Sequence, residues 1–351
     1  MTLYIKGMGN ISPQKTWGEE SLFTPVDYNG DRLKCVEPEY SQWIDPRQLR
    51  RMSRVIKMGV AAGSMALKDA GIPVPQGIIT GTGYGCLDDT GIFLTKLVEN
   101  QEQALNPTPF IQSTHNTIGS QIALLLQCQD YNQTYAHDAF SFESALLDAM
   151  LQLIETPDRK ILIGGVDEIT DTSHAIQKRF GFFSKSENSL ELFSNPSGGT
   201  LNGEGSAFFV LSGKKEEKDK VGIEALTTFY KPDEESLTKG IQNFLDACSL
   251  KSGDIDLILS GKSGDQKSDK IMDRISSALF PLNTIGYFKP YCGEYPTASA
   301  FALWLGVRII QEQNIPDGIV NKKGDKPFKN ILIHNQYFGT HHSMILLRAC
   351  H

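Results

Sequence analysis

Residues 50–85 read RRMSRVIKMGVAAGSMALKDAGIPVPQGIITGTGYG. Apolar and small residues recur in the first part at spacings of three and four: Val55, Met58, Gly59, Ala62, Met65 and Ala66. This spacing predicts a helix over 50–70 with a small-residue face, which Gly71 ends. The apolar run 77–80 then predicts a short strand that leads into the glycine loop 81–85, a succession typical of α/β proteins.

The alternation of helices and short apolar strands continues toward the C-terminus. Helices are predicted over 117–126, 141–154, 269–279 and 298–311, and extended segments over 133–136, 160–165, 202–212, 256–259 and 330–334. The charge-dense run 213–220 is typical of a surface linker. We therefore expect an N-terminal half, 1–213, and a C-terminal half, 221–351, each with a mostly parallel sheet buried on both faces.

The composition excludes several classes of function. At 351 residues and 40% hydrophobic content the chain can form two cores, and a net charge of -7 argues against nucleic-acid binding. No apolar run approaches the ~20 residues that a membrane span needs, and the N-terminus lacks a secretory signal, so a cytoplasmic protein is expected. The six cysteines form no CxxC pair or Cys/His cluster, and the glycine loop lacks nucleotide-binding motifs. We expect neither a metal nor a cofactor.

Seven segments, in the right order, resemble motifs of the β-ketoacyl synthase family, which condenses an acyl-cysteine with malonyl carried on an acyl carrier protein. They are the helix 51–72, the glycine loop 81–85, the segment 107–114, the strand end 164–168, the glycine turn 203–205, the segment 289–294 and the closing loop 335–343. The resemblance implies an α/β thiolase-like fold in which two similar αβ halves form a layered αβαβα arrangement.

The same resemblance indicates that the reaction centre has been lost. The family uses a cysteine at a helix N-terminus, where the helix dipole favours the thiolate, and two histidines that stabilise developing negative charge. Counting from the flanking motifs places Phe140 at the cysteine, and Gly261 and Glu294 at the histidines, while Lys289 is retained and Ala300 replaces a family glutamate. A phenylalanine cannot form a thioester, and the negative charge of a carboxylate would repel that of an enolate rather than stabilise it. No catalytic residue is expected, and these are vestigial positions.

Other residues could in principle supply a nucleophile. Ser141 follows Phe140 at the helix start, with Glu143 or His137 as a possible base, although a first-turn residue that caps the helix is the simpler interpretation. Cys86 and Cys292 lie inside family motifs, but free cysteines are more often small buried apolar residues. The closing loop is also about two residues shorter than in the family, so we do not expect its gate for malonyl entry.

A subset of the family, the chain length factors of type II polyketide systems, resembles this pattern. The resemblance implies a non-catalytic subunit that pairs through the segment 133–136 with an active β-ketoacyl synthase, to which an acyl carrier protein delivers the chain. It also implies that certain apolar residues line an acyl tunnel: Leu87, Gly91, Phe93, Leu94, Leu97 and Phe110. These could equally be ordinary core residues. An active homodimer that uses Ser141 or another nucleophile, and a non-enzymatic acyl-binding protein, stay open, as does the choice among polyketide, polyene and fatty acid products.

Overall fold

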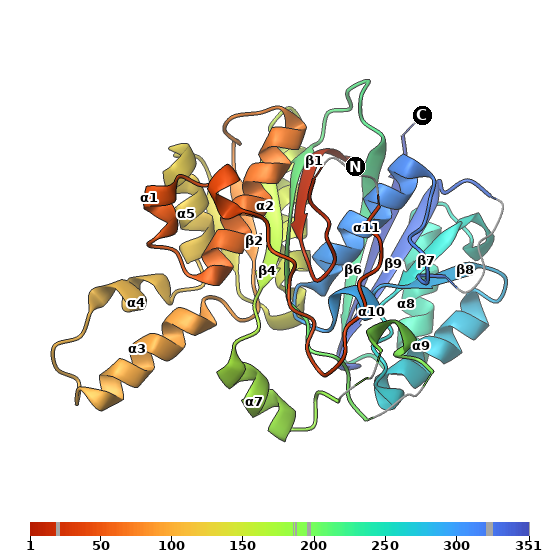
Figure 1. Ribbon diagram of the computed structural model, residues 1–351. Coiled ribbons are helices and arrows are strands. Elements are labelled where there is room, and N and C mark those ends of the chain that lie inside the picture. The colour runs from red at the N-terminus through yellow and green to blue at the C-terminus, as the bar shows by residue number, and fades with distance from the viewer. Residues whose placement is uncertain (19–21, 185, 187, 195–197, 321–325, 351) are drawn as a thin grey trace.

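The computed structural model describes residues 1–18, 22–184, 186, 188–194, 198–320 and 326–350. Its strands form one ten-stranded sheet in the order β3-β2-β4-β5-β1-β6-β10-β9-β7-β8 (Figure 1). The strands are β1 Leu3–Ile11, β2 Ile78–Gly81, β3 Asn132–Tyr135, β4 Ile161–Asp167, β5 Gly205–Ser212, β6 Val221–Tyr230, β7 Leu257–Ser260, β8 Thr284–Tyr287, β9 Asn330–Tyr337 and β10 His341–Ala349. The α-helices are α1 Pro46–Leu49, α2 Arg54–Ala70, α3 Leu87–Glu99, α4 Pro107–Gln112, α5 Thr117–Leu126, α6 Ser141–Glu155, α7 Asp171–Arg179, α8 Glu234–Ala247, α9 Gln266–Leu279, α10 Lys289–Cys292 and α11 Ala298–Glu312.

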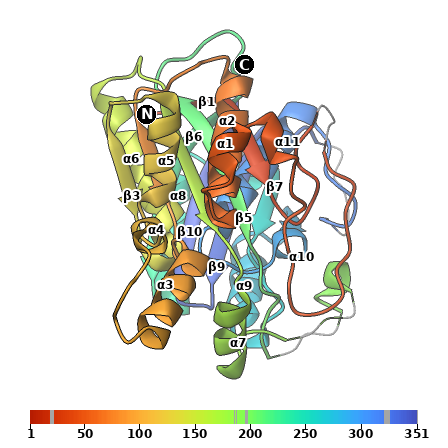
Figure 2. The same ribbon diagram turned by 60° about the vertical axis from the view of Figure 1, so that its left-hand side comes forward.

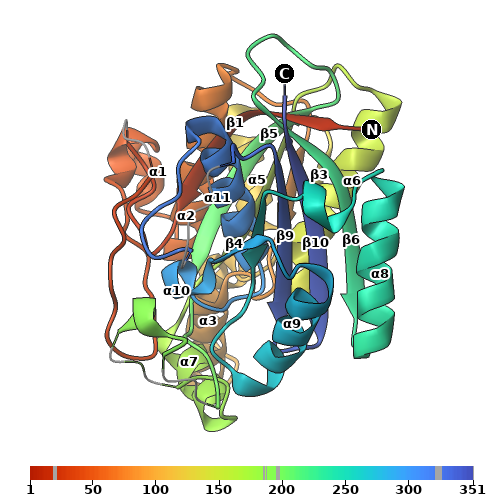
Figure 3. The same cartoon turned by 90° about the vertical axis from the view of Figure 1, so that its right-hand side faces the viewer.

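Three hydrophobic cores show that helices and sheet alternate in five layers. One core joins α2 and α5 to the outer face of β2, β4 and β5, and another joins α8 and α9 to β7, β9 and β10. Between them, α6 and α11 fill a central core that contacts both halves of the sheet, which lie on either side of α11 (Figure 3). Because side chains alternate along a strand, one strand serves two cores: Leu162 faces the first core and Ile163 the central one. The expected αβαβα arrangement is confirmed.

The expectation of a mostly parallel sheet is wrong for half of the strand pairs in each half of the chain. Strands β3, β2 and β4 are parallel, as are β8, β7 and β9. Strand β5 is antiparallel to β4 and β1, and β10 is antiparallel to β9 and β6. For β9 and β10 the reason is local, because only three residues join the two strands and so short a connection can join only antiparallel strands. The sequence analysis also missed β1, β6 and β8 as strands.

The predicted helices agree with the structure to within a few residues. Helix α2 ends at Ala70 because Gly71 takes a left-handed conformation, with φ 71°, and its N–H bonds back to Leu67 and Lys68. The run 213–220 connects β5 to β6 but is not a free linker, since the buried Asp219 pairs with Lys6 of β1 at 2.5 Å. The division into two halves stays a prediction. No helix of the described residues is long and apolar enough to cross a membrane.

The short closing loop is a tight hairpin between β9 and β10. Phe338 and Gly339 have φ of 45° and 65°, and the Thr340 N–H donates to the Tyr337 carbonyl at 3.0 Å. Two successive positive φ values make this a type I′ turn. Only three residues therefore lie between the two strands. That the family's gate for malonyl entry is not built here stays a prediction.

Candidate functional site

Phe140 closes the position where the resemblance places a nucleophile. It ends the short helical turn Asp138–Phe140 that leads into α6, and only 7% of its surface is exposed. Its ring lies edge-on to His341, with centroids 4.7 Å apart, and 5.8 Å from the ring of His137. The aromatic side chain thus fills space at the helix start and packs between two imidazoles.

Ser141 is engaged by the backbone of its own turn. Its hydroxyl donates to the Asp138 carbonyl at 2.6 Å and accepts from the His137 N–H at 2.9 Å. Glu143 points elsewhere, where it accepts a hydrogen bond from Ser343 at 2.7 Å. The His137 ring contacts Ser144 rather than Ser141. The hydroxyl therefore stabilises the helix start, as the simpler interpretation predicted, and has no side-chain base aimed at it.

Gly261 occupies a position that has no room for a side chain. A Cβ there would lie 2.9 Å from the Cα and Oδ1 of Asn335 and from the backbone nitrogen of Gln336. The Gln336 side chain crosses the same place and donates to the Gly261 carbonyl and the Ser263 hydroxyl, at 3.1 Å each. The backbone of β9 has taken the space that a histidine would need. This substitution therefore cannot be reversed without moving a strand.

A buried charge cluster lies where the resemblance places the second histidine. Lys289 and Glu294 form an ion pair in which neither side chain is exposed, and Glu143 is buried nearby. Burial raises the pKa of Glu294 to about 7 and raises that of Glu143, while the ammonium of Lys289 opposes both shifts. Two carboxylates share one cation, so the cluster cannot stabilise an additional negative charge. The ion pair was not predicted from the sequence, and the loss of the histidine stays a prediction.

The cysteines inside family motifs are poor nucleophiles. Cys86 is 1% exposed and Cys292 is not exposed at all. Burial raises the pKa of both thiols, because a thiolate would lose its hydration there. They are small buried residues, as the sequence analysis preferred. Among the described residues, no group of three or more His, Cys, Asp or Glu could hold a metal ion.

Asp167 positions the glycine loop and was missed by the sequence analysis. One carboxylate oxygen accepts from the Thr82 hydroxyl at 2.9 Å and from the backbone nitrogens of Gly83 and Tyr84. The other accepts from the hydroxyl and the N–H of Thr297, at the start of α11. Burial raises the pKa of Asp167 to about 6, although these five donors favour the carboxylate. An acid at the end of a buried strand was the signal for this role.

The loop 81–85 also fixes α7 and the β9–β10 hairpin. The Tyr84 hydroxyl lies 3.0 Å from that of Tyr337 and accepts from the Gln177 amide at 2.9 Å. At the tip of the hairpin, the Phe338 ring packs on Phe182, which follows α7, with centroids 4.8 Å apart. Polar and aromatic contacts therefore join the glycine loop, α7 and the hairpin.

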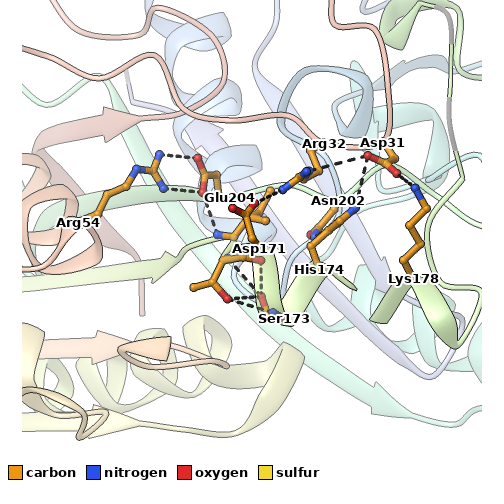
Figure 4. Close-up of polar contacts among 11 residues, drawn as sticks. Asp31, Arg32, Arg54, Asp171, Ser173, His174, Lys178, Asn202 and Glu204 are labelled. Carbon is orange, nitrogen blue, oxygen red and sulfur yellow. Dashed lines mark hydrogen bonds and ion pairs between the residues drawn. The ribbon is translucent and has the colours of Figure 1, made fainter. Parts of the chain in front are cut away.

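A second polar network holds the irregular N-terminal segment against α2 and α7 (Figure 4). Glu204 accepts a two-pronged interaction from Arg54, at 2.7 and 2.6 Å, and also accepts from the backbone nitrogens of Cys35 and Ile169. Such a bidentate interaction fixes the relative orientation of the two side chains as well as the distance between them. This explains the motif 203–205, whose glutamate anchors three separate segments.

The other part of this network fixes α7 itself. Asp31 pairs with Lys178 and lies 3.4 Å from His174, while Arg32 pairs with Asp171 at 2.5 Å (Figure 4). Burial raises the pKa of Asp31, but the hydrogen bonds and charges of Lys178 and His174 together outweigh burial and lower the pKa overall. Both ends of α7 are therefore tied to the segment that contains Asp31 and Arg32.

The predicted tunnel residues divide into two groups. Leu87, Gly91 and Leu94 line a groove of about 470 Å³ between α3 and α7, and Ile176 lies on its other side. A Cβ at Gly91 would meet nothing within 4 Å, so this glycine leaves the groove open. In Figures 1 and 2, α3, α4 and α7 lie at one end of the molecule, beyond the end of the sheet.

The remaining predicted residues face a different neighbour. The rings of Phe93 and Phe110 pack against each other at 5.1 Å and join α3 to α4. Phe110 is 56% exposed, whereas Phe93 and Leu97 are half-buried. The structure thus brings three of the six residues to one groove and two to the contact between α3 and α4. Their role in a tunnel stays a prediction.

Two histidines in the C-terminal half predict acid sensitivity. His334 and His342 lie on adjacent strands with ring nitrogens 3.3 Å apart, and 3% and 0% of their surfaces are exposed. Burial and mutual repulsion lower the pKa of His334, and burial lowers that of His342 to about 4. The unfolded chain, with pKa values near 6.5, therefore takes up protons first as pH falls. Stability should be lost below about pH 6.5, by up to about 1.4 kcal/mol per pH unit for each histidine.

Urea unfolding from pH 7 to pH 4 measures this effect. The variant His342→Gln should show a shallower fall in unfolding free energy than the natural chain, and the exposed His115→Gln should not differ from it. Buried acids with raised pKa values have the opposite effect, because they make the protein more stable as pH falls. The same acids are present in the variant and in the natural chain, so the difference between the two curves measures the contribution of the histidine. Parallel curves for His342→Gln and the natural chain would contradict the prediction.

Comparison with known proteins places this geometry in a family. The N-terminal domain of the β-ketoacyl synthases matches residues 7–217, more than half of the chain, so the chain belongs to the β-ketoacyl synthase family. Its sequence matches no curated protein.

Several solved structures share its fold. They include the ishigamide ketosynthase/chain length factor, with 19% identity, a TM-score of 0.79 and coverage of 100% of this chain and 99% of that chain. A β-ketoacyl synthase from Burkholderia phymatum STM815 has 16% identity, a TM-score of 0.81 and full coverage of both chains. A ketosynthase in complex with its chain length factor from Xenorhabdus doucetiae has 15% identity, a TM-score of 0.77 and coverage of 99% and 98%. At these identities the likeness establishes the fold.

Proposed function

We propose that this chain is a non-catalytic subunit that pairs with an active β-ketoacyl synthase and lends α3 to the wall of its acyl channel, as a chain length factor does. The observation that carries the proposal is an open sheet edge, β3, near the buried Phe140, which stands where the resemblance places the nucleophile. Gly261 and the ion pair of Lys289 with Glu294 support the loss of activity, because neither can stabilise an oxyanion. Similarity in fold to a ketosynthase in complex with its chain length factor also supports it.

Strand β3 supplies the pairing edge. It pairs with β2 on one side, and no described residue pairs with its other side. A groove of about 770 Å³ runs between this strand and α5, and Asn132 and Gln133 are exposed along it. An open edge with unpaired backbone groups favours pairing with another strand.

Apolar side chains flank this edge on both sides. On α6, Leu147, Leu151 and Ile154 follow a spacing of three and four and are 50%, 57% and 55% exposed. On α5, Leu124 is 71% exposed. Exposed apolar residues gathered beside an open strand indicate a protein interface. We define these four residues with β3 as the pairing face.

The opposite edge of the sheet is protected. Gly286 of β8 forms an antiparallel bridge with Val320, and the Tyr287 N–H donates to the Ile319 carbonyl at 2.9 Å. A covered edge cannot add a strand. The two edges therefore differ, and the partner is expected at β3.

Co-expression with a candidate ketosynthase tests the pairing, and one variant tests the missing chemistry. We expect a 1:1 complex in which condensation needs the partner's cysteine. Phe140→Cys in this chain should give no condensing activity when the partner's own cysteine is replaced by Ala, because the oxyanion-stabilising histidines are still missing. A condensing homodimer, an acyl adduct on Ser141, or activity of Phe140→Cys would refute the proposal.

Gly91 offers a way to test the channel without harming the fold. Leucine at this position should fill the groove between α3 and α7 and shorten the product by several carbons, since nothing in the chain opposes a larger side chain. Replacing a helix-interior glycine should also stabilise α3 by up to about 1 kcal/mol. Mass spectrometry of the products measures the chain length. Gly91→Ala is the matched control, because it should stabilise the helix in the same way but adds only a methyl group to the groove. Products of unchanged length with Gly91→Leu would remove this residue from the channel.

A further inference from the structure

The pairing face lies in a part of the chain that contains no lysine or arginine. Between Lys96 and Arg159 neither residue type occurs over 62 residues, whereas the whole chain has 34 in 351, a frequency that would give about six over this length. The same 62 residues contain eight aspartates and glutamates. They include all of α5, β3 and α6, the elements that form the pairing face. This face is therefore built without a permanent positive charge of its own.

Two of these acids lie on the outer side of α6, next to the apolar row of the pairing face. Asp148 and Glu155 are two helical turns apart, and each is adjacent in sequence to a residue of that row, Leu147 or Ile154. Glu155 is exposed and Asp148 is half-buried. The hydroxyl of Tyr131, the residue before β3, donates to Asp148 at 2.9 Å, so this carboxylate lies close to the open strand edge.

No described residue forms an ion pair with either acid. The first two basic residues after α6 have other partners, since Arg159 pairs with Asp130 at 3.3 Å and Lys160 pairs with Glu216 at 2.5 Å. The negative charges on α6 are therefore left to solvent, or to the surface that covers this face.

Glu155 also lies where it opposes the helix that contains it. It is the last residue of α6, and the last turn of this helix has no basic residue. The C-terminal end of a helix carries partial negative charge, so a carboxylate there is repelled. The isolated fold gains nothing from this acid, which indicates a role toward another molecule.

The geometry of strand pairing decides what these acids would meet in a second copy of the chain. Two β3 strands can pair symmetrically only when antiparallel, about a two-fold axis perpendicular to the sheet. Such a pair extends the sheet without turning it over, so helices on the same face of the sheet meet across the axis. Helix α6 packs in the central core and α5 in the outer core, where Arg50 and Arg51 share a pocket with Leu124. A second copy would therefore bring α6 against α6, with Asp148 and Glu155 of both copies and no cation between them.

From this arrangement we infer that the pairing face selects by charge a partner that presents lysine or arginine opposite Asp148 and Glu155, and that it disfavours a second copy of this chain. The inference rests on the proposed function and adds the chemistry of the partner's surface and two specificity residues. Opposite charges across an interface speed association and fix its register, whereas like charges suppress the wrong partner. The apolar row can contribute affinity for either partner, so the acids are the groups that discriminate.

One double variant tests both parts of the inference. Asp148→Asn with Glu155→Gln removes two charges, keeps the shape of both side chains and leaves an acceptor for the Tyr131 hydroxyl. The matched control, Glu235→Gln with Asp246→Asn, removes two exposed acids from α8, which packs on β7, β9 and β10 instead. Titration would use the ketosynthase that co-purifies with the natural chain, at about 50 mM and about 500 mM NaCl.

We expect the two kinds of pairing to change in opposite directions. The double variant should bind the ketosynthase at least about tenfold more weakly at low salt, and the loss should shrink at high salt, where charges are screened. Without ketosynthase it should self-associate at least about fivefold more tightly than the natural chain, as sedimentation equilibrium measures. The control variant should match the natural chain in both measurements. A change that only damaged the face would weaken both pairings, so the opposite directions identify selection by charge.

Each contrary result overturns a different statement. Unchanged affinity for the ketosynthase, or a loss that the control variant shares, would overturn the basic surface of the partner. Self-association no tighter than that of the natural chain would overturn the selection against a second copy. If the natural chain formed no complex with any ketosynthase, the proposed function would fail instead, and the self-association measurement would still test the inference.

Discussion

Replacing Lys289 with Met should lower the free energy of unfolding by about 3–5 kcal/mol, because it leaves Glu294 and Glu143 buried without their cation. Lys289 and Glu294 are both fully buried, so water cannot take over the role of the ammonium. Removing one partner of a buried pair costs far more than the pair contributes in total. Urea unfolding at pH 8 measures the loss.

The pH dependence of this variant separates charge from packing. Glu294 already has a pKa raised to about 7, above its unfolded value near 4.3, so the stability linked to its proton is full at low pH and is lost as pH rises. Without Lys289 that pKa should rise further, and the variant should be much less destabilised at pH 5 than at pH 8. The double variant Lys289→Met with Glu294→Gln should recover much of the loss. A deficit equal at both pH values would show that packing, not charge, is responsible.

Leu151→Asp should abolish pairing with the ketosynthase, with a loss of affinity of at least a hundredfold, or about 2.7 kcal/mol. Leu151 lies in the middle of the apolar row on α6, 57% exposed, beside the open edge of β3. In a complex this position is expected to be buried, where a carboxylate would lose its hydration without gaining a partner. Size-exclusion chromatography and titration of the two subunits measure the change.

A matched control tests whether the effect belongs to the pairing face. Leu282 is 97% exposed and precedes β8, at the opposite edge of the sheet. Leu282→Asp makes the same chemical change and should leave pairing intact. If both variants pair normally, or both fail, the interface does not lie at β3. A self-associating chain that Leu151→Asp converts to a monomer would instead point to a homodimer.

The prediction that Phe140 stands at the position of the nucleophile rests on motifs that lie on both sides of it. The predicted helix from 141 fits the observed α6, Ser141–Glu155, so the position before it, Phe140, follows by counting alone. The apolar spacing within a helix and the glycine that ends it are local properties of the sequence. Helix α2, which ends just before Gly71, shows that they predict where a helix ends. Strand direction depends on which distant segments meet. The antiparallel pairing of β5 with β4 and β1 was therefore missed.

The candidate site shows the same division. The prediction that Gly261 and Glu294 stand at the positions of the histidines rests on residue identity, which the sequence contains. That Gly261 has no room for a side chain depends on the approach of Asn335, which is 74 residues away in the chain and belongs to another strand. The tunnel residues of α3 share one helix, yet Gly91 and Phe93 face different neighbours, α7 and α4. Such partners come from packing between elements.

By itself, the sequence determined the fold class and the resemblance to the β-ketoacyl synthase family, because these depend on residue identity, short-range periodicity and motif order. Only the tertiary structure decided that β3 is open while β8 is covered, that Lys289 pairs with Glu294, and that the groove hydroxyls of Thr170 and Ser173 are already engaged. The physical reason is the same in each case. Hydrogen bonds, ion pairs and strand pairs form between residues that are far apart in the chain. The polar groups and strand edges that are left without a partner, on which function depends, are therefore known only from the complete folded structure.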